Sequence, residues 1–301
     1  MADVKYDFIE YKKIFKDREK RLKLLKKMSF IPTPLYLRIV YYIKTGRILH
    51  LNHPKGFSEK IQWLKTHDIH PEYARFVDKN EAKKYIIDRF GEEYVFPCYG
   101  VWDRYDDIDF TSLPQKFVLK CTHDSGSIKI IQNKDDIDHS ELKKYFNDRL
   151  IGYKNVSREY PYNYVQPRIM AEKLYEPDDH EVLKDYRFFC YNGVPKIFYI
   201  HTGRNLADEK QTWFDMDFNR LDIIDVTTPQ SHSSVERPAC FEQMVEFSKE
   251  LSRGIRFLRV DLYEDKEKYY FSEMTFFPYG GFVILKPEKW EKLLGDWITL
   301  D

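Results

Sequence analysis

Apolar and polar positions alternate most clearly near the carboxyl-terminal end of the chain. Residues 257–263 and 268–274 each show the period of two that is typical of a half-buried strand, and charged residues lie between them. The pattern therefore predicts a hairpin. The same alternation places Arg259, Asp261 and Tyr263 on one face of its first strand.

Two carboxylates and a hydroxyl fall on this predicted hairpin. Asp261 and Glu273 are twelve positions apart (273 − 261), which allows a hairpin to bring them together, and Thr275 follows two residues later. Oxygen ligands of this kind suit Mg²⁺, a hard cation that usually shares them with phosphates. An exposed hairpin whose charges are merely solvated is the alternative interpretation.

A second pair of apolar strands is predicted within residues 116–131, K-F-V-L-K-C-T-H-D-S-G-S-I-K-I-I. In the polar loop between them, Ser125, Gly126 and Ser127 would let backbone N–H groups approach phosphate oxygens closely. Lys120, at the end of the first strand, would add a positive charge. The spacing is not that of a P-loop, and an ordinary hairpin turn is the alternative.

One further segment is suited to hold a nucleotide base. Residues 165–175 predict an apolar strand that turns polar at Glu172 and Lys173. An adenine ring could hydrogen-bond the main chain around Lys173 and Leu174, while Glu172 could accept a hydrogen bond from its amino group.

The dipeptide Asn192-Gly193 gives the clearest short hairpin signal of the chain. We expect the charged residues around it, Lys184, Asp185, Arg187 and Arg204, to lie at the rim of that hairpin.

The remaining pattern is mainly helical. Pro34 opens a helix that runs to about Thr45, and Ser58 is a plausible N-cap for the next one. A third helix begins at Asp78 and is stopped by Gly91. The other predicted elements are a strand at 94–99, a loop at 103–114, helices at 138–150 and 241–252, and a polar loop at 208–238.

A charged helix with an apolar stripe is predicted for residues 5–30, where basic side chains between Lys12 and Lys27 outnumber the acids. One interpretation is a solvated helix that packs on the body of the protein. The other is a peripheral contact with an anionic membrane surface.

The composition narrows the classes of function. Lys+Arg and Asp+Glu both total 49, so no global field favours nucleic acid as a partner. The 23 Tyr and 22 Phe exceed what a core usually needs and suit clefts for planar or sugar-like ligands. The four cysteines are dispersed without a C-x-x-C pair, which argues against a zinc site or disulfide framework and fits a reducing compartment.

The chain shows no sequence signal for export or membrane insertion. Its amino end is charged and polar, which argues against a signal peptide, and no apolar run reaches about 18 residues. We therefore expect a cytoplasmic protein.

Six short motifs follow one another between residues 50 and 290. They are D-K-N-E-A-K at 78–83, V-L-K-C-T-H-D-S-G-S at 118–127, I-M-A-E-K-L at 169–174, K-D-Y-R at 184–187, R-V-D-L at 259–262 and E-M-T at 273–275. In this order they resemble the ATP-grasp enzymes, specifically the TupA-like branch associated with teichuronopeptide and surface-polysaccharide biosynthesis. Many ATP-grasp ligases have E-x-N where this chain has E-M-T, so Thr275 would replace an amide oxygen as metal ligand.

The resemblance implies an α+β ATP-grasp fold in which two α+β lobes grip ATP, with an extra N-terminal helical segment at 1–75. The catalytic region would span 76–301. It would contain a preceding subdomain at 76–115, a phosphate-loop lobe at 116–175 and a metal-binding lobe at 176–301.

The resemblance also implies a carboxylate–amine ligase that uses ATP and Mg²⁺ and forms an amide through an acylphosphate. Its substrates would be an amino acid or amine and a uronic-acid-type carboxylate of a surface-polysaccharide precursor. The implied roles are catalysis for Arg259, Arg204 and Lys120, nucleotide binding for Lys79, Lys120, Ser125, Gly126, Ser127, Glu172, Lys173, Leu174, Lys184 and Asp185, and metal binding for Asp261, Glu273 and Thr275.

Two other functions stay open at the level of sequence. A glycosyltransferase would need a metal motif, and the D-x-D pattern occurs at Asp215-Met216-Asp217, in a polar stretch without a strong preceding strand. A non-catalytic nucleotide-binding module is the second alternative, which the presence of Lys120, Asp261 and Glu273 disfavours. His123 and His201 fit either a structural or a substrate-contacting role.

Overall fold

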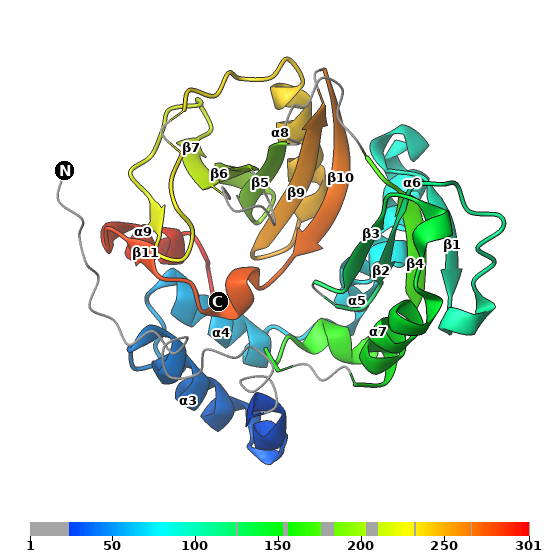
Figure 1. Cartoon of the computed structure of the whole chain (residues 1–301). Coiled ribbons are helices and arrows are strands. Elements are labelled where there is room, and N and C mark those ends of the chain that lie inside the picture. Colours follow the sequence, from blue (N-terminus) through cyan, green and yellow to red (C-terminus); the bar gives the residue numbers. More distant parts are fainter. Residues whose placement is uncertain are drawn as a thin grey trace.

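Two antiparallel β-sheets lie on either side of the centre of the molecule (Figure 1). The computed structural model describes residues 24–124, 126–152, 156–175, 184–202, 210–231, 233–265 and 267–300. Helices cover the outer faces of both sheets, and the first helices of the chain lie together below them in Figure 1. This is the expected α+β architecture with two lobes and an N-terminal helical segment.

The smaller sheet has the strand order β1-β4-β2-β3. The long helix α7 (His139–Gly152) covers it, because Leu142 and Phe146 pack against the alternating Phe117 and Leu119 of β2. β4 lies between two partners, so the strand predicted at 165–175 is an interior strand. The bounds are β1 Cys98–Trp102, β2 Phe117–Cys121, β3 Ile128–Ile131 and β4 Ile169–Lys173.

The strand predicted at 94–99 was misplaced. Residues Glu92–Tyr94 form the short 3-10 helix η3, and β1 begins only at Cys98. Val95 and Phe96 are apolar because they are buried in the core rather than because they pair in a sheet. The following loop contains a further 3-10 turn, η4, at Tyr105–Asp107.

The larger sheet has the strand order β10-β9-β5-β6-β7. The Asn192-Gly193 turn joins β5 to β6 as predicted, with φ of 49° and 82° at its two residues. Helix α8 (Phe241–Ser252) covers the apolar face, where Phe241 contacts Phe188 and Phe198. The bounds are β5 Lys184–Tyr191, β6 Val194–Thr202, β7 Lys210–Asp215, β9 Leu258–Asp265 and β10 Lys268–Thr275.

The opposite face of the larger sheet is polar although it is buried. Arg187 of β5 lies opposite Asp261 of β9 and opposite Tyr199 of β6, so these side chains share one face. Asp185 and Arg187 are 2% and 7% exposed. The expectation that they lie at the rim of a hairpin was therefore wrong, because the hairpin strands are interior to a five-stranded sheet.

The last helix of the chain packs against the N-terminal helices. Pro34 lies in the first turn of α3 (Thr33–Thr45), and Gly46 ends it with φ of 69°. Helix α4 (Phe57–His67) begins after its N-cap residue Gly56, and the N–H groups of Lys55 and Gly56 donate to Oε2 of Glu59, so the N-cap predicted at Ser58 was wrong. Residues 1–23, with most of the predicted charged helix, lie outside the described residues.

Ser58 instead joins α4 to the end of the chain. Its backbone N–H donates to Oε1 of Glu291 at 2.7 Å and its hydroxyl to the carbonyl of Val283 at 2.8 Å. Glu291 belongs to α9 (Lys289–Asp296), whose Gly295 has no side chain and so allows the Lys55 carbonyl to approach. A Cβ at Gly295 would lie 2.4 Å from that oxygen.

The polar loop predicted at 208–238 contains two strands. β7 carries the buried Trp213 and Phe214, and β8 (Ile224–Asp225) pairs with β11 (Leu285–Lys286). Short apolar pairs between polar residues do not raise the average hydrophobicity of a segment, so the pattern did not predict these strands.

The remaining elements are η1 Met28–Phe30, η2 Pro71–Tyr73, α5 Ala74–Val77, α6 Lys79–Phe90, η5 Lys134–Asp136, η6 Tyr160–Tyr164 and η8 Pro278–Gly281. Within the described part of the chain, we find no helix with the length and apolar character that crossing a membrane requires.

Candidate active site

The loop between β2 and β3 is joined to the start of helix α6. Asp78 caps that helix by accepting hydrogen bonds from the N–H groups of Asn80 and Glu81. The next residue, Lys79, donates from Nζ to the carbonyl of Asp124 in the loop. Lys79 thus reaches the loop that the sequence predicts to hold phosphates.

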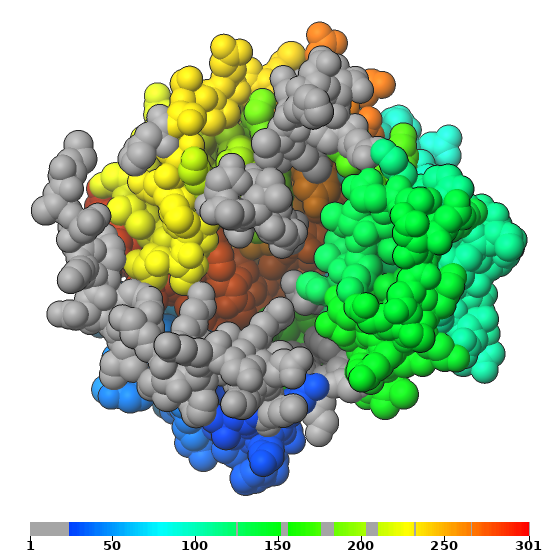
Figure 2. Space-filling view, in the orientation of Figure 1, coloured from blue at the N-terminus to red at the C-terminus, as the bar shows by residue number. Residues whose placement is uncertain are grey.

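Lys79 also interacts electrostatically with the larger sheet. Burial lowers the pKa of Lys79, and the charges of Asp124 and Glu273 oppose this shift while Lys120 adds to it. Because Glu273 belongs to β10, the β2–β3 loop and the predicted metal hairpin face a common space. Figure 2 shows a hollow on this side, between the green surface of the smaller sheet and the orange-to-red surface of the last strands.

The geometry of the loop suits a close backbone approach. Gly126 is exposed with φ of 94°, a conformation that glycine adopts readily. Ser127 is buried, its carbonyl accepts a hydrogen bond from the N–H of Cys121 at 3.0 Å, and its hydroxyl donates to the Asp124 carboxylate. Ser125 lies outside the described residues. Phosphate binding by Gly126 and Ser127 stays a prediction.

Two lysines hold the buried carboxylate of Glu172. Lys120 donates to Oε1, and Lys83 of α6 donates to Oε2 at 2.5 Å. Burial alone would raise the pKa of Glu172, but the charges of Lys120 and Lys83 lower it to about 2. Both carboxylate oxygens are therefore engaged by lysines, which differs from the expected hydrogen bond to adenine. Lys83, the second lysine of D-K-N-E-A-K, was not predicted as a site residue, although it lies one helical turn after Lys79.

The predicted adenine position lies where β4 ends. The N–H of Lys173 already donates to the carbonyl of Pro97 at 2.9 Å, and Leu174 follows the strand. Aromatic side chains lie beside this point, because Phe96 contacts the rings of Tyr175 and Tyr270 at 5.2 and 4.6 Å between centroids. A cavity of about 980 Å³ is bounded by Phe96, Lys173, Tyr175 and Tyr270 among others. Base binding at Lys173 and Leu174 remains a prediction.

The three predicted metal ligands converge on one nitrogen atom of Arg259. Its Nη2 lies 2.6 Å from Oδ2 of Asp261, 3.1 Å from Oε1 of Glu273 and 3.1 Å from Oγ1 of Thr275. The strand register explains this, since Glu273 lies directly opposite Asp261 and Thr275 opposite Arg259. A carboxylate pair and a hydroxyl that surround one cationic atom form an oxygen donor set of the kind that Mg²⁺ prefers.

Asp261 differs from the open ligand that the sequence suggested. It is 0% exposed, and Arg259 binds both of its oxygens, with Nε 2.7 Å from Oδ1. Burial raises the pKa of Asp261 to about 7, against the opposing charges of Arg259 and Arg187. The Glu273 side chain is 34% exposed, so the accessible part of the donor set is on β10.

A series of hydrogen-bonded polar groups connects the oxygen donor set on β9 and β10 to the segment that follows β10. The Arg187 guanidinium donates to the hydroxyl of Tyr199, which also accepts from Tyr279, and Gln211 donates to Tyr279. Tyr279 and Gly280 have φ of 56° and 63°. Tyr199, Tyr279 and Gln211 were not predicted from the sequence, because alternation along a strand does not show which polar positions meet across a sheet.

The other predicted site residues lie around this centre or outside the described residues. Lys184 lies 3.4 Å from the Glu264 carboxylate, and Asp185 binds the Arg187 guanidinium at 2.6 Å. His201 is buried on β6, opposite Asp185. Arg204 is outside the described part of the chain. Nucleotide binding by Lys184 and Asp185 stays a prediction.

A second cavity, of about 760 Å³, lies between α3, α4 and residues 156–167. Its described lining includes three basic side chains, Lys26, Lys65 and Arg158, and no acidic one. Lys65 donates to the carbonyl of Gly280 at 2.6 Å, which places the cavity next to the segment after β10. Burial lowers the pKa of Lys65 to about 7, while the charge of Glu159 opposes this shift.

The family model described as TupA-like ATPgrasp matches residues 59–299. The chain belongs to the TupA-like ATP-grasp family. ATP-grasp family members are ligases that form C–N bonds, and they bind ATP with Mg²⁺. This TupA-like ATP-grasp protein carries the oxygen donor set and the lysines described above in the segments that the family model covers.

Solved ATP-grasp structures resemble the chain at low sequence identity. The D-alanine–D-alanine ligase of Helicobacter pylori has 12% identity, with 81% of this chain and 69% of that chain covered and a TM-score of 0.46. The D-alanine–D-alanine ligase of Bacillus anthracis has 17% identity, with 74% of this chain and 66% of that chain covered and a TM-score of 0.43. The RimK domain ATP-grasp protein of Sphaerobacter thermophilus has 9% identity, with 76% of this chain and 69% of that chain covered and a TM-score of 0.41. The chain thus spans about two thirds of the length of these proteins. No curated protein matches the sequence.

Proposed function

We propose that this TupA-like ATP-grasp protein is an ATP-dependent ligase that joins an amine to a sugar carboxylate. A carboxylate oxygen of the acceptor attacks the γ-phosphorus of ATP, and ADP leaves. The amine nitrogen then attacks the acyl carbon of the acylphosphate, phosphate leaves, and the amine gives up a proton to form the amide. The acceptor would be a uronic-acid-type residue of a surface-polysaccharide precursor, and the amine an amino acid or a related compound.

The convergence of Asp261, Glu273 and Thr275 on one cationic atom carries this proposal. These residues would hold Mg²⁺, which would supply positive charge to balance the phosphates during phosphoryl transfer. Arg259, which binds all three side chains, would stabilise negative charge on the acyl group.

The opposite side of the site would hold the nucleotide. Lys79 and Lys120 would bind phosphate oxygens together with the backbone around Gly126 and Ser127. Lys83 is then a positioning residue, because it binds the same Glu172 carboxylate as Lys120 and fixes where that ammonium lies.

The cavity beside Lys65 supports an anionic acceptor. The charges of Lys26 and Arg158 in its lining favour a carboxylate, and the partly exposed ring of Tyr162 offers an apolar face on which a sugar can pack. We place the reaction at the cytoplasmic face of the membrane, because basic residues between Lys12 and Lys27 would favour anionic lipid.

The geometry gives the glycosyltransferase alternative no support. Asp215, in the D-x-D pattern, accepts hydrogen bonds from the N–H groups of Asp217 and Asn219 at 3.0 and 2.8 Å. Its carboxylate therefore caps a turn, which explains the motif without a metal.

Product analysis tests the ligase. Enzyme, MgATP, glucuronic or galacturonic acid and an amino-acid mixture should give ADP and a product heavier than the sugar acid by the amine less water. ADP release that requires an amine but occurs only with a peptide-like carboxylate would contradict the proposed acceptor class, although it would still agree with a ligase reaction. Consumption of a sugar nucleotide without ADP release would contradict the ligase itself.

A further inference from the structure

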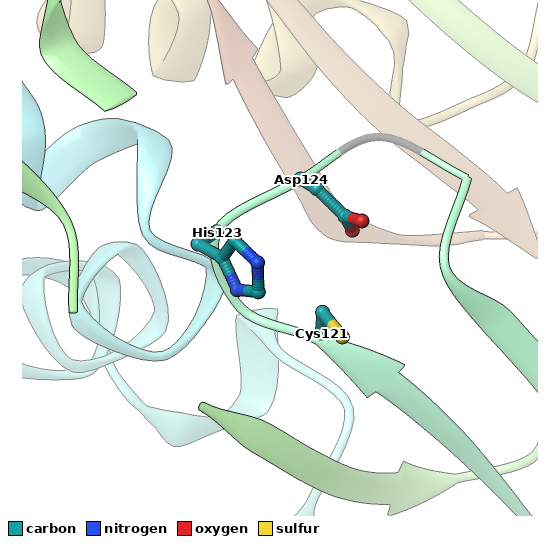
Figure 3. A group of neighbouring side chains, drawn as sticks. All are labelled: Cys121, His123 and Asp124. Atoms are coloured by element: carbon teal, nitrogen blue, oxygen red, sulfur yellow. The ribbon is translucent and has the colours of Figure 1, made fainter. Parts of the chain in front are cut away.

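Three side chains with metal-binding atoms meet in the β2–β3 loop. They are the thiol of Cys121, the imidazole of His123 and the carboxylate of Asp124, whose ligand atoms all lie within 4.8 Å of one another. Figure 3 shows them grouped on the inner side of the bend that the loop makes. They come from positions i, i+2 and i+3 of one segment, C-T-H-D, so the sequence search for paired cysteines could not find them.

The surroundings of the group match those of a metal site. Cys121 and His123 are both 0% exposed, so water competes little for their ligand atoms. Among the described residues, Oδ1 of Asp124 is buried and has no hydrogen-bond partner, while Oδ2 accepts from the Ser127 hydroxyl. A buried carboxylate oxygen without a partner is costly, and a cation beside it would remove that cost.

We propose that Cys121, His123 and Asp124 form a site for a borderline-soft divalent cation of the Zn²⁺ class. Thiolate, imidazole and carboxylate are the three ligand types that Zn²⁺ accepts, and a three-residue set leaves one coordination position open. Ligand atoms around tetrahedral Zn²⁺ lie about 3.5 Å apart, so the three groups need to close by about 1 Å. This site is separate from the oxygen donor set on β9 and β10, which suits Mg²⁺.

Charge balance favours occupation of the site. On binding, the Cys121 thiol gives its proton to solvent, and the thiolate and the Asp124 carboxylate then match the two charges of the cation. Lys79 donates a hydrogen bond to the backbone carbonyl of Asp124 rather than to its carboxylate. The bound cation would tie the last residue of β2 to the bend of the loop and restrict the movement of the loop.

Cobalt absorption tests the site without reference to the ligase reaction. One equivalent of Co²⁺ added to the full chain without nucleotide should give visible d–d bands and a thiolate-to-cobalt charge-transfer band that saturates at one ion per chain. Added Zn²⁺ should abolish both. A folded chain that shows no charge-transfer band would overturn the proposal.

Matched variants separate this site from chance binding at another cysteine. Cys121→Ser should lose the charge-transfer band, and His123→Gln and Asp124→Asn should each weaken the apparent Co²⁺ affinity at least about tenfold. Cys98→Ser, which changes the exposed cysteine, should retain the band. Circular dichroism establishes that each variant is folded. A band that persists in Cys121→Ser, or that depends on Cys121 but on neither His123 nor Asp124, would contradict the three-residue site.

Discussion

Glu172 and Asp261 are both buried carboxylates beside two basic side chains, one in each sheet, yet their pKa values shift in opposite directions. At Glu172, one lysine binds each oxygen, and their charges outweigh burial and lower the pKa to about 2. At Asp261, complete burial dominates, the charge of Glu273 adds to it, and the pKa rises to about 7 despite Arg259 and Arg187.

The difference reflects the charge balance of the two sheets. Around Glu172 there are two lysines to one carboxylate, so the smaller sheet presents excess positive charge. Around Arg259 and Arg187 there are three carboxylates, those of Asp185, Asp261 and Glu273, to two guanidinium groups. The local charge is thus positive on one side and negative on the other, which agrees with the proposal that a phosphate chain and a metal ion bind between them.

The largest expected effect is on turnover and comes from the oxygen donor set on β9 and β10. Glu273→Gln should lower ADP release about a thousandfold, or about 4 kcal/mol, because the accessible carboxylate of the donor set is lost. ATP binding, followed by titration calorimetry, should change little. The control is Glu267→Gln, in the exposed turn of the same hairpin. Equal activity of the two variants would contradict metal binding at Glu273.

Around Glu172 of the smaller sheet, the largest expected effect is on stability. Glu172→Gln should lower the free energy of unfolding by about 3 kcal/mol near neutral pH, because it leaves the buried Lys83 and the half-buried Lys120 without their anion. The folded-state pKa of Glu172 lies below its unfolded value of 4.5, so its contribution is complete above pH 4.5 and is lost as the pH falls towards 2. Urea unfolding at several pH values measures the difference from wild type, which should shrink in acid. A difference that grows in acid would contradict the assigned ion pairs.

Binding of ATP should depend on Lys120 by a smaller amount. Lys120→Ala should weaken ATP binding by about 2 kcal/mol, the contribution of a charged hydrogen bond to a phosphate. Lys116→Ala, at the exposed position just before the same strand, serves as the control. Unchanged ATP affinity in the Lys120 variant would show that this lysine serves only to neutralise Glu172.

The smallest expected effect comes from the polar chain behind the donor set. Tyr199→Phe removes the hydroxyl that binds both Arg187 and Tyr279, and should cost about 1 kcal/mol of unfolding free energy. Thermal unfolding measures it, with the exposed Tyr42→Phe as control. A loss as large as that of Glu172→Gln would place Tyr199 in a more critical role than these two hydrogen bonds explain.

Local patterns predicted the parts of the fold that local interactions decide. Alternation along residues 257–274 predicted a hairpin, in which the structure pairs Glu273 with Asp261. Asp78 begins α6 and Asn192-Gly193 turns as their side-chain chemistry predicts. The N-cap predicted at Ser58 was wrong, because this serine is instead buried against α9.

Long-range pairing explains what the sequence did not show. Lys83 meets Glu172 across 89 positions, and no periodicity of either segment marks that contact. Asp185 and Arg187 were expected at the surface because charged residues usually lie there. They are buried because each neutralises the other within the polar face of the larger sheet.

The contact of α4 with α9 determines when the protein can finish folding during synthesis. Ser58 and Lys60 bind groups near the carboxyl end, Glu291 and the Ile298 carbonyl, more than 230 positions later. Helix α4 therefore emerges from the ribosome well before its partners and cannot complete its packing until residues 291–298 have been made. At about 5–20 residues per second this delay lasts about 10 to 50 seconds, during which the apolar side of the helix is exposed to chaperones.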